Sequence, residues 1–156
     1  MSKLNVTALV FALAWTGLAM AQQKPSLDIG IQPLTDDALK CGVTKSSVES
    51  IAALTLRNNG VQPKEFRVGY NSPFLYVNIT ALSIGDGRVC VANIQAGITT
   101  MVPARSYGVF KPRDSHQLDY LCNESGVMTG LSNDFGERVI SKLEQEIKLC
   151  LGKLVY

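Results

Sequence analysis

Residues 74–98 read FLYVNITALSIGDGRVCVANIQAGI, and this stretch decides the fold. Two apolar, β-branched runs flank Gly85-Asp86-Gly87, and a Gly/Asp turn between such runs predicts a β-hairpin. Side chains alternate across a strand, so one face of the second run is apolar and the other polar. The apolar face carries Cys90, Ala92, Ile94, Ala96 and Ile98, and the polar face carries Asn93, Gln95 and Thr99. The pattern predicts a sheet with one buried and one solvated face, with Cys90 on the buried side.

The N-terminal segment has the composition of a secretory signal peptide. Lys3 precedes an apolar run over residues 6–18, and a small-x-small cleavage site ends at Ala21. The run is shorter than the roughly 20 apolar residues that a membrane-spanning helix needs. We therefore expect residues 1–21 to be removed between Ala21 and Gln22. Residues 22–156 would remain as one disulfide-bonded domain without a membrane span, either periplasmic or secreted.

The four cysteines are Cys41, Cys90, Cys122 and Cys150. In an exported chain an even number of cysteines predicts disulfides, and four cysteines allow three connectivities. A bond from Cys41 to Cys90 would pin a helix entrance to the buried face of the hairpin, and one from Cys122 to Cys150 would join the last strand to the last helix. The spacings do not resemble the C-x-x-C pairs of zinc sites, so we expect no metal and no cofactor.

Two amphipathic helices are predicted. Thr44 is a good N-cap, Val43 and Val48 have the spacing of a hydrophobic staple, and the first helix should cover residues 45–58. Asp134 with Glu137 resembles a capping box at the start of the second helix. Apolar residues then recur at steps of three and four: Phe135, Val139, Leu143, Ile147, Cys150 and Leu154.

Four further segments alternate like strands, at residues 27–32, 65–70, 107–110 and 116–122, whereas residues 123–130 receive no assignment. Pro33 follows the first segment and favours an edge position for it. Helices near both ends of the chain with strands between them are typical of an α+β fold. We expect an antiparallel sheet of four to six strands with the two amphipathic helices packed on one face.

Candidate catalytic residues are few. His116 is the one histidine, and no nucleophile signature surrounds it. The carboxylate pairs Asp36-Asp37 and Asp114 with Asp119 lack the apolar pocket that acid/base catalysis requires. We therefore expect no catalytic residue and no enzyme, with a hydrolase or redox enzyme as the remote alternative.

Two other groups of residues have both a structural and a functional interpretation. The aromatic residues Phe66, Tyr70, Phe74 and Tyr76 crowd near one end of the hairpin, where they either fill the core or line a ligand site. Asn78 and Asn123 each begin an N-glycosylation sequon, and we interpret both as chance matches.

Three pieces of the sequence, Cys41-Gly42-Val43-Thr44, Phe74-Leu75-Tyr76-Val77-Asn78 and Cys90, resemble a group of small exported proteins of Gram-negative bacteria that have no assigned activity. The resemblance covers residues 27–98 and the C-terminal helix. It implies a periplasmic location and a pairing of Cys41 with Cys90, and it brings no functional residue. Cys122 and Cys150 would be additions to the shared pattern.

The leading functional hypothesis is a non-enzymatic accessory protein that binds another envelope protein, through the solvated face of the hairpin or by strand addition to a free sheet edge. The alternative is a carrier of a small molecule or lipid, with its pocket beneath the aromatic cluster. A net charge of +2 with scattered charges argues against nucleic acid as a partner. The oligomeric state is left open by the sequence.

Overall fold

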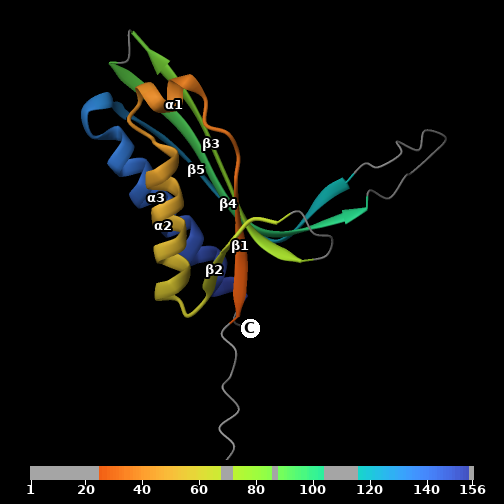
Figure 1. Ribbon diagram of the computed structural model, residues 1–156. Coiled ribbons are helices and arrows are strands. Elements are labelled where there is room, and N and C mark those ends of the chain that lie inside the picture. Colours follow the sequence, from red (N-terminus) through yellow and green to blue (C-terminus); the bar gives the residue numbers. More distant parts are fainter. Residues whose placement is uncertain (1–24, 68–71, 86–87, 104–115, 155–156) are drawn as a thin grey trace, which may run out of the picture.

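The computed structural model describes residues 25–67, 72–85, 88–103 and 116–154. The cleavage site at Ala21 and Gln22 and the strand expected at 107–110 lie outside these ranges. The elements follow one another as β1 (Ser26–Ile31), α1 (Asp36–Lys40), α2 (Lys45–Asn58), β2 (Gln62–Glu65), β3 (Pro73–Ile84), β4 (Val89–Pro103), β5 (His116–Leu131) and α3 (Ser132–Lys153). The predicted α+β class is confirmed, with one sheet and one layer of helices (Figure 1).

The sheet has five strands in the order β2-β1-β3-β4-β5. β3, β4 and β5 are antiparallel neighbours, as the hairpin predicts. β1, however, runs parallel to both β2 and β3, so the expectation of a wholly antiparallel sheet was wrong and the sheet is mixed. β1 is also not an edge strand, because β2 flanks it. β1 and β2 can be parallel because a crossover through α1 and α2, not a tight turn, joins them.

All three helices lie on the same face of the sheet (Figure 1). The short helix α1 adds a third to the expected two. In α2 the predicted N-cap is confirmed, because the Thr44 hydroxyl accepts a hydrogen bond from the Ser47 amide at 3.2 Å. The predicted start of α3 was wrong: the helix begins at Ser132 after Leu131, which makes no side-chain cap, and Asp134 lies in its first turn.

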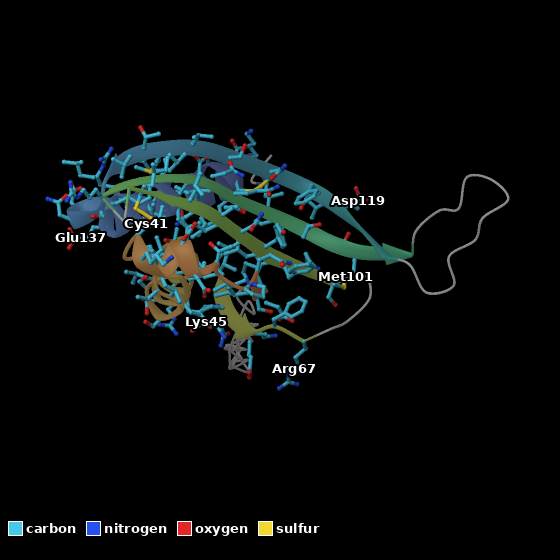
Figure 2. The ribbon with its side chains drawn as sticks, turned by 90° about the horizontal axis from the view of Figure 1, so that it is seen from above. Cys41, Lys45, Arg67, Met101, Asp119 and Glu137 are labelled. Atoms are coloured by element: carbon cyan, nitrogen blue, oxygen red, sulfur yellow. A yellow bond between two sulfur atoms is a disulfide. The ribbon has the colours of Figure 1, made fainter. Side chains whose placement is uncertain are left out.

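The core lies between the sheet and the helices. Its largest fully buried side chains come from both layers and are Phe135, Leu56, Leu75, Ile79, Ile94, Ile98, Leu143, Ile147, Val43, Val48, Val77 and Val139. Two disulfides cross from one layer to the other. Cys41 is bonded to Cys90 and Cys122 to Cys150, with Cα separations of 5.9 and 5.6 Å. Figure 2 shows Cys41 between the helices and the strands.

β5 is much longer than the strand predicted over residues 116–122. It continues through the unassigned stretch 123–130 and leads directly into α3. At its other end β5 pairs with β4 as far as Pro103 and His116, whereas β3 stops pairing with β4 at Thr100. The two strands therefore extend beyond the rest of the sheet as a ribbon that diverges from the helices (Figure 1).

Candidate functional site: a groove at the edge of the sheet

The residues considered for catalysis do not form a common site. Asp36 and Asp37 lie in the first turn of α1. His116 and Asp119 belong to the β4–β5 ribbon, far along the sheet, and Asp114 lies outside the described residues. Within the described ranges, no three side chains of the metal-binding types gather at one place. No helix in the described part of the chain is long and apolar enough to cross a membrane.

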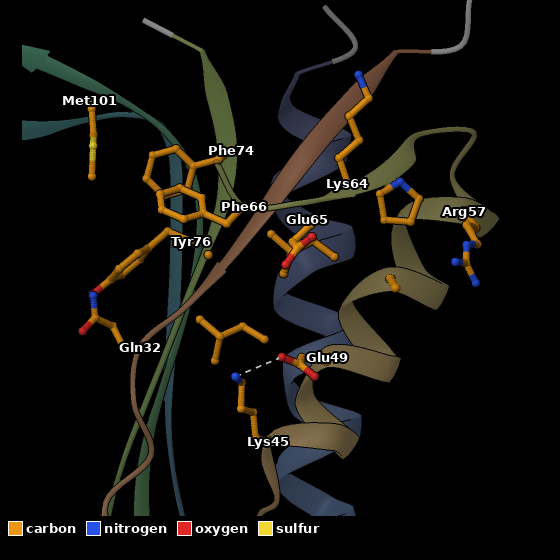
Figure 3. Close-up of a pocket in the computed structure, with 15 residues that line it drawn as sticks. Gln32, Lys45, Glu49, Arg57, Lys64, Glu65, Phe66, Phe74, Tyr76 and Met101 are labelled. Carbon is orange, nitrogen blue, oxygen red and sulfur yellow. Dashed lines mark ion pairs between the residues drawn. The ribbon is translucent and has the colours of Figure 1, made fainter. Parts of the chain in front are cut away.

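A groove of ≈ 820 Å³ runs beside β1, on the side of the sheet where β2 ends (Figure 3). We call it the edge groove. Strand β1 forms its floor, α2 forms one wall and aromatic side chains form the other. Its lining residues are Ile29, Gly30, Ile31, Gln32, Lys45, Glu49, Ala53, Arg57, Pro63, Lys64, Glu65, Phe66, Phe74, Tyr76 and Met101.

The floor of the edge groove includes an unpaired strand edge. β2 pairs with β1 only as far as Ile29, whereas β1 continues and pairs with β3 through Ile31. The amide of the next residue, Gln32, donates to the Val77 carbonyl at 2.9 Å, toward β3. Successive residues of a strand direct their backbone groups to opposite sides, so Ile31 directs its N–H and C=O toward the groove. No described strand pairs with this edge.

The edge is open because the chain leaves the plane of the sheet after Glu65. Its next two residues, Phe66 and Arg67, lie over β1 on the face that the helices leave uncovered. There the Arg67 amide donates to the Asp28 carboxylate at 3.2 Å, and Phe66 packs on Phe74 with ring centroids 4.9 Å apart. The crossing therefore ends β2 early and also builds the aromatic wall.

Gly30 explains how the two phenylalanine rings lie so close to the strand. A β-carbon at this position would lie 3.2 Å from the Phe74 ring and 3.3 Å from the Phe66 ring. Glycine in a strand often marks a place where another group approaches the backbone closely. The missing side chain thus lets the aromatic pair pack on β1, with Tyr76 and Met101 continuing the same wall.

The opposite wall is one stripe of α2. Lys45, Glu49, Ala53 and Arg57 follow at intervals of four residues and so share one side of the helix. Lys45 and Glu49 form an ion pair at 3.5 Å between side chains that are both mostly exposed. Ala53 leaves a gap in the middle of this charged stripe and lines the groove together with Ile29, Gly30 and Ile31 of β1.

The sequence identified part of this site. Phe66, Phe74 and Tyr76 of the predicted aromatic cluster do come together, while Tyr70 lies outside the described residues. The stripe on α2 was not identified as a wall, although its four-residue spacing is visible in the sequence. The open edge of β1 could not be identified, because it depends on where β2 stops.

The hairpin pattern predicts that the uncovered face of the sheet is solvated. This face is not uniformly polar, however. Near the hairpin turn it exposes large apolar side chains from three adjacent strands, which are Leu82, Ile84, Val89, Val127 and Leu131. Contiguous exposed apolar surface of this kind is typical of regions that contact other macromolecules.

Comparison with known proteins gives no assignment for this site. The sequence matches no protein-family model and no curated protein.

Proposed function

We propose that this chain is a non-enzymatic exported protein, periplasmic in a Gram-negative host, that binds another envelope protein. In this proposal the partner supplies an extended segment that lies in the edge groove and adds to β1 as a further strand. The observation that carries the proposal is the unpaired edge of β1 at Ile31, opposite the α2 wall of a groove.

Strand addition uses two properties that the edge groove combines. Unpaired backbone groups on a strand give affinity for any extended chain, and pockets on either side select its alternate side chains. One side of the groove offers Phe66, Phe74 and Tyr76, and the other offers the small Ala53 between charged neighbours. The partner segment should therefore alternate between apolar residues facing the aromatic wall and smaller or polar residues facing α2.

Two further observations support an exported binding protein. The two disulfides are consistent with an oxidising compartment. The apolar patch near the hairpin turn offers a second contact area on the same molecule. Neither observation depends on the edge groove.

One observation favours the alternative function, a carrier of a small molecule or lipid. A volume of ≈ 820 Å³ lies within the range of small-molecule sites, and Phe66, Phe74 and Met101 give one wall an apolar surface. A carrier would retain an apolar ligand through purification. Native mass spectrometry of the oxidised protein would then show a discrete added mass.

Site-specific photo-crosslinking tests the proposal. A photoreactive residue is placed at Ala53, which lines the groove, and in a matched control at Leu54, which is exposed on another side of the same helix. Both proteins are irradiated in the envelope of the host. We expect a crosslink from position 53 to one defined segment of one partner, and none to that segment from position 54.

The same positions supply matched variants. A synthetic peptide of the crosslinked segment should bind the oxidised protein, and Ala53→Glu should weaken binding at least tenfold while Leu54→Glu leaves it unchanged. Equal labelling from positions 53 and 54, or a peptide that binds Ala53→Glu normally, would contradict strand addition in the groove. A retained apolar mass that Ala53→Glu removes would instead support the carrier.

A further inference from the structure

The uncovered face of the sheet carries a second group of side chains, in the middle of β3, β4 and β5. The sheet register places Tyr76 beside Gly97 and Asn123, and the next row places Asn78 beside Gln95 and Ser125. Tyr120 lies next to the first row and contacts Tyr76. We call the set Tyr76, Asn78, Gln95, Tyr120 and Asn123 the amide–aromatic platform.

The two tyrosines of the platform are held in a fixed arrangement. Their ring centroids are 6.2 Å apart and the rings are nearly perpendicular, at 76°. Gly97 lies beneath them, and a β-carbon there would lie 2.9 Å from the Tyr120 ring. A glycine inside the long strand β4 weakens the strand, so its presence is explained by the ring that packs on it. Tyr120 nevertheless remains 36% exposed.

The amides of the platform are also oriented. The Gln95 side chain donates from Nε2 to the Asn123 carbonyl oxygen at 2.9 Å. This bond leaves the Gln95 carbonyl oxygen and the Asn123 amide nitrogen to face solvent as an acceptor and a donor. Asparagine is disfavoured in strands, yet Asn78 and Asn123 both lie on this face.

The platform is uncharged. Residues 73–84 and 89–103, which form β3 and β4, contain no Asp, Glu, Lys or Arg. On β5 two charged residues adjoin the platform in sequence, Asp119 next to Tyr120 and Glu124 next to Asn123. Strand alternation directs both to the opposite face, where Glu124 pairs with Lys153 of α3. A phosphorylated or otherwise charged ligand would find no counter-charge among the five platform side chains.

We infer that the amide–aromatic platform binds a neutral oligosaccharide. The C–H face of a pyranose ring stacks on a tyrosine ring, and neighbouring hydroxyl groups exchange hydrogen bonds with the Gln95 carbonyl and the Asn123 amide. The Tyr120 hydroxyl, which is protonated at neutral pH, is a further donor.

This inference goes beyond the proposed function and does not depend on it. Gln95, Asn123 and Tyr120 do not line the edge groove, whereas Tyr76 belongs to both surfaces. Variants at Tyr76 are therefore left out of the test.

NMR titration of the full oxidised protein tests the inference. The probes are cellotetraose and the linear tetramer of N-acetylglucosamine, each added to about 10 mM, the concentration needed to detect a millimolar dissociation constant. We expect at least one probe to shift the side-chain amide signals of Gln95 and Asn123 with saturation. Asn123→Ala and Tyr120→Ala should each weaken binding at least tenfold, and Tyr120→Phe should retain most of it. Thr129→Ala, on the same face outside the platform, should have no effect.

Three results would overturn the inference. They are no saturable shift with either probe, shifts confined to residues of the edge groove around Ala53, and unchanged binding by folded Asn123→Ala and Tyr120→Ala proteins. Peptide binding in the groove is measured separately on the same Asn123→Ala protein, so failure of one proposal is distinguished from failure of the other.

Discussion

Gly136 of α3 lies directly against the backbone of Gly42, in the connection between α1 and α2. A β-carbon on Gly136 would lie 2.7 Å from the Gly42 carbonyl carbon, and Gly42 itself has a φ of +78°. The close approach packs the N-terminal part of α3 against the connection between α1 and α2, one residue after Cys41 of the Cys41–Cys90 disulfide. Both glycines are therefore needed for different reasons: one for space and the other for its backbone conformation.

Gly136→Ala should destabilise the protein by about 2–3 kcal/mol, because the added methyl group meets backbone atoms that cannot move away easily. Gly152→Ala is the matched control in the same helix, since a β-carbon there meets no atom within 4 Å. It should stabilise the helix by about 0.5 kcal/mol. Urea unfolding measures both, and equal stability of the two variants would contradict the close approach.

Each disulfide should contribute about 4 kcal/mol to the free energy of unfolding, from the loops of 49 and 28 residues that they close. Replacing Cys41 and Cys90 together by Ala, or Cys122 and Cys150 together, should lower the urea midpoint of the oxidised protein. With a reductant, the urea midpoint of the wild type should fall close to that of a variant in which all four cysteines are replaced by Ala. Equal midpoints for the oxidised and the reduced wild type would contradict the expected contribution of the disulfides to stability.

The ion pair of Lys142 with Glu146 should contribute more to the stability of the protein than an exposed ion pair on the same helix. Lys142 Nζ lies 2.6 Å from Glu146 Oε1, and the Glu146 side chain, which lies beside Gly126, is only 3% exposed. Lys142→Ala leaves this carboxylate buried without its partner and should cost roughly 2 kcal/mol. Lys148→Ala, which removes the exposed pair with Glu144, should cost below about 0.5 kcal/mol.

A double substitution distinguishes loss of charge pairing from loss of packing at this position. Glu146→Gln added to Lys142→Ala should recover part of the lost stability, because the uncompensated charge is gone. No recovery would show that the lysine acts through its aliphatic chain over Gly126.

Alkaline stability should depend on Tyr120. Its pKa is raised above the ordinary value of about 10 by burial and by Tyr76. The folded state therefore holds the proton more tightly than the unfolded state, so this contribution is complete below pH 10 and is lost as the pH rises through the folded pKa. Tyr120→Phe should show a shallower fall in melting temperature between about pH 9 and 11 than the wild type. Parallel curves would contradict the assignment.

Local signals in the sequence predicted the elements that local interactions build. The Thr44 cap and the following apolar stripe define α2, and the Gly-Asp-Gly turn predicts the antiparallel pairing of β3 and β4. The α+β class follows from the same signals, since an apolar stripe and an apolar sheet face must cover each other.

The remaining features depend on contacts between distant residues. Gly126 and Gly130 interrupt the strand pattern of β5, yet they are there because the long side chains of Lys142 and Arg138 lie over them. The position of β1 between β2 and β3 has no local signal, because Pro33 ends a central strand as readily as an edge strand. The edge groove could not be predicted for the same reason: it is formed by the crossing of Phe66 and Arg67 over β1.

The placement of the two disulfides has a mechanical consequence. The first disulfide begins at Cys41, so β1 lies outside both closed loops. Non-covalent contacts hold it: backbone pairing with β2 and β3, side-chain packing and the hydrogen bond from the Arg67 amide to Asp28. Tension applied to the N-terminal end would act first on β1, whereas the loops from Cys41 to Cys90 and from Cys122 to Cys150 would resist extension through their cross-links. β1 is thus the strand that a pulling force would extract first, and its removal would take the floor of the groove with it.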